Sequence, residues 1–167
     1  MRRGELLSAA GILTLSGLFV LAGTSTSLRA EQAEKRTWRL TMEGKDPRLE
    51  YGTDNAEDIS IAFSCAAGRG RVDVFMAETS TGVKPRRAMT ASLTAGSTTS
   101  KVRGKTLPNE EAGTPSFEGT MSANDPLLAA LSKERNLVIV VGPSRDQVPL
   151  REIGDKADRF NRLCQKK

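Results

Sequence analysis

The chain has 167 residues, a length that suits one domain. Hydrophobic residues make up 38% of it and charged residues 27%, an ordinary globular balance, but aromatic residues are only 4%, so we expect an aliphatic core. The chain contains no histidine. This excludes Ser-His-Asp and Cys-His catalytic sites and removes the commonest metal ligand.

The first 30 residues have the layout of a secretory signal peptide. Arg2 and Arg3 precede an apolar run over residues 6–22, small polar residues follow, and Ala30 is a small residue before the expected cut. The alternative is a permanent membrane helix, but the run falls short of the ~20 apolar residues that span a bilayer. Whether export uses the Sec or the twin-arginine route stays open.

Export would place the mature protein in the periplasm or the medium. Removal of Arg2, Arg3, Arg29 and Glu5 lowers the formal net charge from +5 to +3. This mild excess does not indicate nucleic-acid binding. We expect a flexible leader over residues 31–36, one domain over residues 37–167 and no membrane span after cleavage.

Residues 37–121 alternate between apolar and polar side chains in short runs, the pattern of half-buried strands. The apolar members of these runs are Trp38, Leu40 and Met42; Leu49 and Tyr51; Ile59, Ile61, Phe63 and Cys65; Val72, Val74 and Met76; Met89, Ala91 and Leu93; Val102; Phe117 and Met121. Gly68-Arg69-Gly70 predicts a hairpin turn between the third and fourth runs, and residues 107–115 a loop.

The last third of the chain adds two helices and two strands. Asp125 followed by Pro126 predicts a helix start. The apolar run 137–141 predicts a central strand covered on both faces. Residues 147–150 predict an edge strand, because Pro149 lacks the N–H of a central ladder. A final helix is expected over residues 155–165.

The two cysteines, Cys65 and Cys164, predict one disulfide. Cys65 ends an alternating strand on its apolar face. Cys164 shares a helical stripe with Ile153, Ala157 and Phe160, so both thiols face the core. The predicted fold is mainly β with α: a twisted antiparallel sandwich or partly closed barrel, with a C-terminal helix packed on it and tied by the disulfide.

The order of these features resembles small exported proteins of unknown function from Gram-negative bacteria. More distantly it is similar to periplasmic accessory proteins of type VI secretion. The resemblance rests on the tryptophan strand, the Phe-Ser-Cys end at residues 63–65, the Pro-Leu-Leu-Ala-Ala-Leu run at 126–131 and the final helix with its cysteine. It implies location and fold, and it supplies no active-site residues.

Three clusters of residues are candidate sites. Gly68-Arg69-Gly70 lacks the third glycine and following helix of a dinucleotide loop, which favours a turn. Asp54, Glu57 and Asp58 lack the ligand order of an EF-hand calcium loop, which favours a solvated turn. The third cluster, named here the basic face, is a candidate surface for an anionic envelope component or partner protein; it consists of Lys84, Arg86, Arg87, Lys101, Arg103 and Lys105. Its alternative is a solvated surface.

No cofactor or metal motif stands out, and no aromatic residues interleave with the basic face, which argues against single-stranded nucleic acid. The expectation is an exported, non-catalytic binding or envelope-accessory protein. The alternatives are an enzyme that uses carboxylates alone and an inhibitor of a foreign enzyme. A net charge of +3 disfavours inhibition of cationic lysozymes, for which an acidic inhibitor is expected.

Overall fold

The computed structural model of the chain describes residues 35–55 and 58–165. The chain divides into two units, Met1–Gln32 and Ala33–Lys167, and everything below concerns the second unit. The predicted signal peptide over residues 1–30, most of the predicted leader and Glu57 lie outside the described residues. Within the described part, no helix has the length and apolar character needed to cross a membrane.

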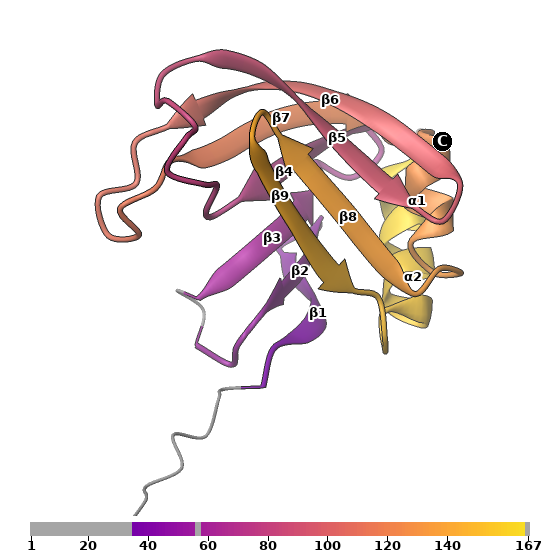
Figure 1. Cartoon of the computed structure of the whole chain (residues 1–167). Coiled ribbons are helices and arrows are strands. Elements are labelled where there is room, and N and C mark those ends of the chain that lie inside the picture. Colours follow the sequence, from indigo (N-terminus) through magenta and orange to yellow (C-terminus); the bar gives the residue numbers. More distant parts are fainter. Residues whose placement is uncertain (1–34, 56–57, 166–167) are drawn as a thin grey trace, which may run out of the picture. The chain divides into compact units, whose positions relative to one another are not determined.

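Nine strands form a single antiparallel sheet that curls into an open half-barrel (Figure 1). The strand order is β1-β2-β3-β4-β7-β6-β5-β8-β9. The bounds are β1 Thr37–Glu43, β2 Asp46–Gly52, β3 Ile59–Ser64, β4 Arg71–Met76, β5 Ala88–Ala95, β6 Thr98–Leu107, β7 Ser116–Ser122, β8 Asn136–Val141 and β9 Ser144–Pro149. The predicted fold class is confirmed, in its partly closed barrel form.

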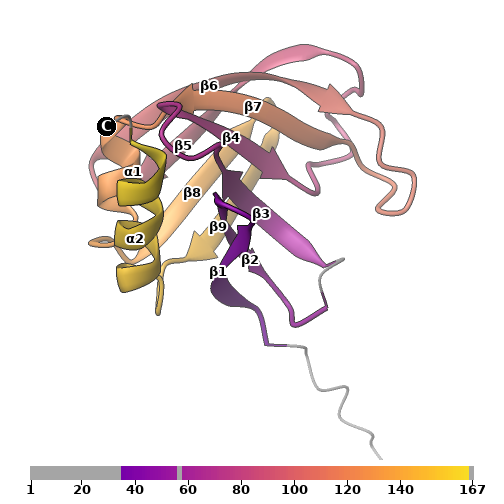
Figure 2. The same cartoon turned by 180° about the vertical axis from the view of Figure 1, so that it is seen from behind.

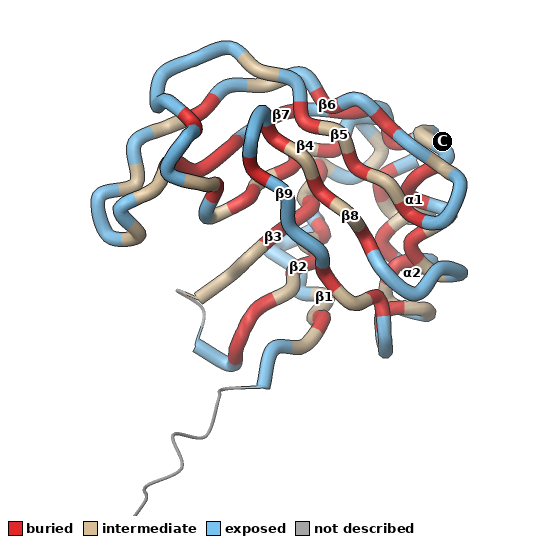
Figure 3. The backbone as a smooth tube through the Cα atoms, in the orientation of Figure 1, coloured by how far each residue is buried: buried red, intermediate tan, exposed pale blue. Residues whose placement is uncertain are grey.

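The concave inner face of the sheet holds the core, and the two helices lie beside it (Figures 1 and 2). Helix α1 spans Pro126–Ala130, and the carboxylate of Asp125 accepts a hydrogen bond of 2.9 Å from the Leu127 N–H, as expected of a helix N-cap. Helix α2 spans Gly154–Cys164, and its apolar stripe is buried as predicted. Buried positions alternate along the strands, and exposed ones cover the outer face (Figure 3).

The predicted disulfide between Cys65 and Cys164 is present, with the two Cα atoms 5.8 Å apart. The turn Gly68-Arg69-Gly70, next to the disulfide, makes hydrogen bonds to the end of α2. The Gly68 N–H donates to the Leu163 carbonyl oxygen (3.2 Å), and the Gly70 N–H donates to the Cys164 carbonyl oxygen (3.3 Å). Both acceptors belong to the last turn of α2, where helix carbonyls lack partners within the helix. The β3–β4 connection therefore caps the helix that the disulfide fastens.

The apolar run 137–141 departs from its prediction. It forms β8, which lies second from the edge of the sheet, between β5 and β9. Leu137, Ile139 and Val141 are buried, whereas Val138 and Val140 are half-buried on the outer face. The expected covering of both faces is wrong. Both helices pack on the inner face of the sheet, and within residues 35–55 and 58–165 no second layer covers the outer face of β8. Pro149 lies on the edge strand β9, as predicted.

Candidate functional site

The outer face of the sheet carries two rows of side chains that run across neighbouring strands. The strand register aligns the first row as Arg48, Ser64, Asp73, Thr120 and Arg103. It aligns the second row as Glu50, Ala62, Phe75, Glu118 and Lys105. Both rows cross β2, β3, β4, β7 and β6 in that order. Charged, hydroxyl and aromatic groups from distant parts of the chain thus share one surface.

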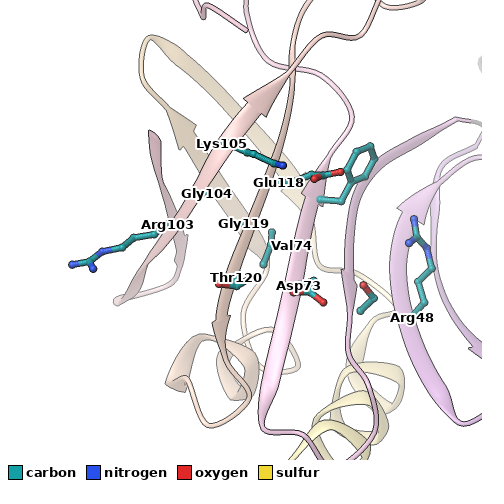
Figure 4. Close-up of a pocket in the computed structure, with 11 residues that line it drawn as sticks. Arg48, Asp73, Val74, Arg103, Gly104, Lys105, Glu118, Gly119 and Thr120 are labelled. Atoms are coloured by element: carbon teal, nitrogen blue, oxygen red, sulfur yellow. The ribbon is translucent and has the colours of Figure 1, made fainter. Parts of the chain in front are cut away.

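A hollow of about 710 Å³ opens on this surface (Figure 4), a size typical of small-ligand sites. Its lining consists of Arg48, Ser64, Asp73, Val74, Phe75, Arg103, Gly104, Lys105, Glu118, Gly119 and Thr120. Charged groups of both signs and two hydroxyls surround the half-buried Phe75 ring. Such a lining suits a polar ligand with an apolar part.

A pair of glycines lies in the floor of the hollow. Gly104 and Gly119 face each other across β6 and β7. A Cβ atom on Gly104 would lie 2.0 Å from the Glu118 carbonyl oxygen and 2.7 Å from the Phe117 ring, and one on Gly119 would lie 2.9 Å from that ring. Only glycine fits this close approach of backbone to an aromatic ring. Strands β6 and β7 therefore pack closely on the Phe117 ring, directly beneath the hollow.

One rim of the hollow is held rigid by a buried carboxylate. Glu50 is 6% exposed and accepts from two arginines. The Arg48 Nε donates to its Oε2 at 2.8 Å, and Arg39 reaches its Oε1 at 3.2 Å through Nη2. Hydrogen-bonded pairing of this kind is what allows a carboxylate to be buried. Arg48 is therefore a fixed and already neutralised cation at the rim.

The opposite rim is the β6 part of the basic face. Lys101, Arg103 and Lys105 alternate on the exposed side of β6, so successive charges are about 7 Å apart along the strand. The register places hydroxyl residues of β5 beside two of them, Thr90 next to Arg103 and Ser92 next to Lys101. The Lys101 Nζ donates to the Ser92 Oγ at 3.1 Å. In Figure 4 Lys105 points toward Glu118, and Arg103 points away from the hollow.

The other part of the basic face, residues 84–87, is tied to the same strand through Thr106. The Thr106 Oγ1 donates to the Lys84 carbonyl oxygen at 2.7 Å and accepts from the Arg87 N–H at 3.1 Å. The Arg86 N–H also donates to the Thr106 carbonyl oxygen at 2.8 Å. These bonds use the backbone of residues 84–87 and leave the three cationic side chains exposed. The structure thus brings both halves of the basic face to one hairpin.

The segment that carries the basic face contains no acidic residue, and the nearest carboxylate across the strands is Glu118, opposite Lys105. Residues 79–109 contain its six cations and no Asp or Glu. Within the described part of the chain, none of the six has a carboxylate oxygen within 4 Å, whereas Arg36, Arg39, Arg48 and Arg71 each do. Asp73 and Glu118 provide the acidic groups of the adjacent hollow, and Asp73 already contacts Arg71 at 3.4 Å. The surface therefore offers free positive charge beside a shaped hollow.

The acidic cluster is divided by the structure. The Asp58 carboxylate pairs with Arg36 at 2.8 Å, and the fully exposed Asp54 lies 3.7 Å from Arg39. Over residues 35–55 and 58–165, no group of three or more Asp, Glu or Cys side chains is arranged to hold a metal ion. Asp58 is the partner of Arg36, which precedes β1, and Asp54 lies near Arg39, which is within β1.

Most residues of the hollow carry no signal in the sequence. They lie at the outward-facing positions of strands whose inward-facing residues are apolar, and they are Arg48, Ser64, Asp73, Phe75, Glu118 and Thr120. That alternation shows that these side chains face outward. It does not show that β4 pairs with β7, which brings Asp73 next to Thr120.

No family model matches the chain, and no curated protein matches it. Among solved structures, the chain is similar to invasion associated protein B from Bartonella henselae at 12% identity and a TM-score of 0.43. The match covers 76% of this chain and 96% of that one.

Proposed function

We propose that this protein is an exported, non-catalytic binding protein of the bacterial envelope that holds an anionic partner on its basic face. The observation that carries the proposal is the gathering of six exposed cations on one hairpin, within a segment, residues 79–109, that contains no Asp or Glu. Free charge gathered on one surface attracts a ligand of opposite sign and speeds its encounter.

The compartment is part of the proposal. The disulfide fits an oxidising environment outside the cytoplasm. The predicted signal peptide and the resemblance to small exported proteins of Gram-negative bacteria support the periplasm as that environment.

The build of the surface supports binding rather than catalysis. The Lys105 end of β6 and residues 84–87 are fixed to one another by Thr106, so the cations are presented on a rigid scaffold. Asp73 is open to solvent, and Glu118 is exposed. A pair of carboxylates that performs acid–base catalysis usually has one member buried, so that the two groups differ in environment. Here neither Asp73 nor Glu118 is buried, which supports binding rather than catalysis.

The test is site-specific photo-crosslinking in the native host. A photoreactive residue at Thr120, between Asp73 and Arg103 in the cross-strand row, should capture a partner, and one at the exposed Asp158 of α2 should not. Replacement of Lys101, Arg103 and Lys105 by serine should abolish the adduct.

A matched variant removes the same charge elsewhere. Lys133, Arg135 and Arg159 are exposed and lie outside the basic face. Their replacement by serine should leave the adduct intact. Equal loss in both triple variants would show that only net charge matters and would refute a specific basic face.

A further inference from the structure

Among residues 35–55 and 58–165, no strand pairs with the outer side of the edge strand β1, and the backbone groups on that side can be identified. Met42 lies opposite Pro47 in the β1–β2 ladder. Pro47 has no N–H, and its carbonyl oxygen accepts from the Cys65 N–H at 3.2 Å, so its backbone faces β3 rather than β1. Met42 and Pro47 therefore form a non-hydrogen-bonded pair. The N–H and C=O groups of Met42, and by alternation those of Leu40, point to the open side of β1.

The two edges of the sheet are protected unequally. Strand β9 carries Arg145, Asp146 and Pro149, residues that typically discourage strand addition. On β1, the Trp38 indole closes only the beginning of the strand, through its hydrogen bond to the Pro149 carbonyl oxygen. The open part of β1 thus runs from Arg39 to Glu43.

The open part of β1 carries an exposed apolar side chain. Met42 is the only large hydrophobic side chain exposed among the described residues, at 41% exposure. Leu40, on the same face, is only partly buried. An edge with free backbone groups and an exposed apolar side chain is suited to pairing with another strand.

We propose that two copies of this protein pair through β1, antiparallel and centred on Thr41. The segment Arg39-Leu40-Thr41-Met42-Glu43 is complementary to itself in this register. Arg39, whose guanidinium also contacts Glu50 and Asp54 of its own chain, faces Glu43 of the second copy. Leu40 faces Met42, and Thr41 faces Thr41. Opposite charges, apolar pairs and threonine pairs are all favourable across strands. A two-fold axis through Thr41 repeats each unlike pair and closes the assembly at two chains.

Backbone geometry agrees with this register. Leu40 of one copy and Met42 of the other both turn their N–H and C=O groups to the open side, so these two residues form a hydrogen-bonded pair. Thr41 faces Thr41 of the other copy in a non-hydrogen-bonded pair. Centring on Leu40 or Met42 also satisfies the backbone. Those registers place Arg39 opposite Thr41, or Thr41 opposite Glu43, and lose both charge pairs. The β1 edge is separate from the basic face, so this inference stands independently of the proposed function.

A cysteine scan tests the register. Facing Cα atoms in a non-hydrogen-bonded pair lie about 4.5 Å apart, within disulfide range. Purified Thr41→Cys protein should therefore oxidise to a covalent dimer, and Thr90→Cys, exposed on the internal strand β5, is the control. Leu40→Cys and Met42→Cys should cross-link more slowly than Thr41→Cys. Equal rates at Thr41 and Thr90, or a faster rate at Leu40 or Met42, would overturn the proposal.

Sedimentation equilibrium without cross-linking tests the same contact. The mass of the unmodified protein should approach twice that of one chain as concentration rises. Met42→Pro should abolish the dimer, because it removes an N–H from the open side and none from the β1–β2 ladder. Glu43→Arg should weaken the dimer about tenfold, and Lys45→Glu in the adjacent turn should leave it unchanged. A single-chain mass at every concentration, or a dimer that survives Met42→Pro, would refute it.

Discussion

The Trp38 indole N–H donates a hydrogen bond of 2.7 Å to the carbonyl oxygen of Pro149, and so joins the first strand of the sheet to the last. The two residues are 111 positions apart. Trp38 also packs against the Tyr51 ring, which is tilted by 44° at a centroid distance of 5.4 Å, and stacks with the Phe63 ring at 6.5 Å. A buried indole needs a partner for its N–H, and here that partner lies on the opposite edge of the half-barrel.

Trp38→Phe should lower the free energy of unfolding by about 1–3 kcal/mol, because it removes this hydrogen bond and leaves a cavity beside Phe63. Urea denaturation measures the loss. Tyr51→Phe, which keeps the ring that packs on Trp38, should change stability by less than about 0.5 kcal/mol. Equal effects of the two substitutions would show that the hydrogen bond from Trp38 to Pro149 contributes little to stability.

Local patterns in the sequence were sufficient for the disulfide. Cys65 and Cys164 lie on the apolar phase of a strand and of a helix, and burial forces both phases toward the same core. The helix start at Asp125 was similarly accessible, because a cap and a following proline are local signals.

Local sequence patterns could not predict the hollow or the position of β8 in the sheet. The β4–β7 pairing skips two strands in sequence and sets which polar side chains meet. The apolar run of β8 indicates burial but does not say on how many faces. Gly104 and Gly119 are required because the Phe117 ring lies beneath them. No short-range pattern in the sequence predicts this contact.

Gly104→Ala should destabilise the protein by about 1–3 kcal/mol, since the added methyl group meets backbone that cannot move aside. Gly154→Ala provides the control, because a Cβ atom there meets nothing within 4 Å. Thermal melting of the two variants measures the difference. If both melt alike, the strands have room at the glycine pair and the account of the hollow is wrong.

Reduction of the disulfide, or the double change Cys65→Ala and Cys164→Ala, should cost about 2–5 kcal/mol, because the bond closes a loop of 99 residues. Helix α2 should be lost first, since it is too short to be stable alone and its cap at Gly68 and Gly70 depends on the same connection. Hydrogen exchange should show faster exchange in α2 than in β4 and β7. Uniform loss of protection would contradict this order.

The side chains of the basic face should be dispensable for folding. Thr106, which holds residues 84–87 against β6, should be needed for it. Arg86, Arg87, Arg103 and Lys105 are exposed, so their joint replacement by serine should cost no more than about 0.5 kcal/mol each. Any loss of partner capture in this variant would then report on binding. A large loss of stability would instead show that these side chains hold the hairpin.

Thr106→Val provides the contrasting case. Thr106 is 0% exposed, and its hydroxyl is bonded to both the Lys84 carbonyl oxygen and the Arg87 N–H. Valine keeps the shape of threonine but leaves these two backbone groups, which lie in part-buried hydrogen bonds, without their partner. The cost is about 1–3 kcal/mol for each group that the fold shields from water. The midpoint of urea unfolding should therefore fall well below that of the serine variant. If residues 84–87 detach as a result, partner capture should also weaken although every cation remains, because the six charges then no longer share one rigid surface.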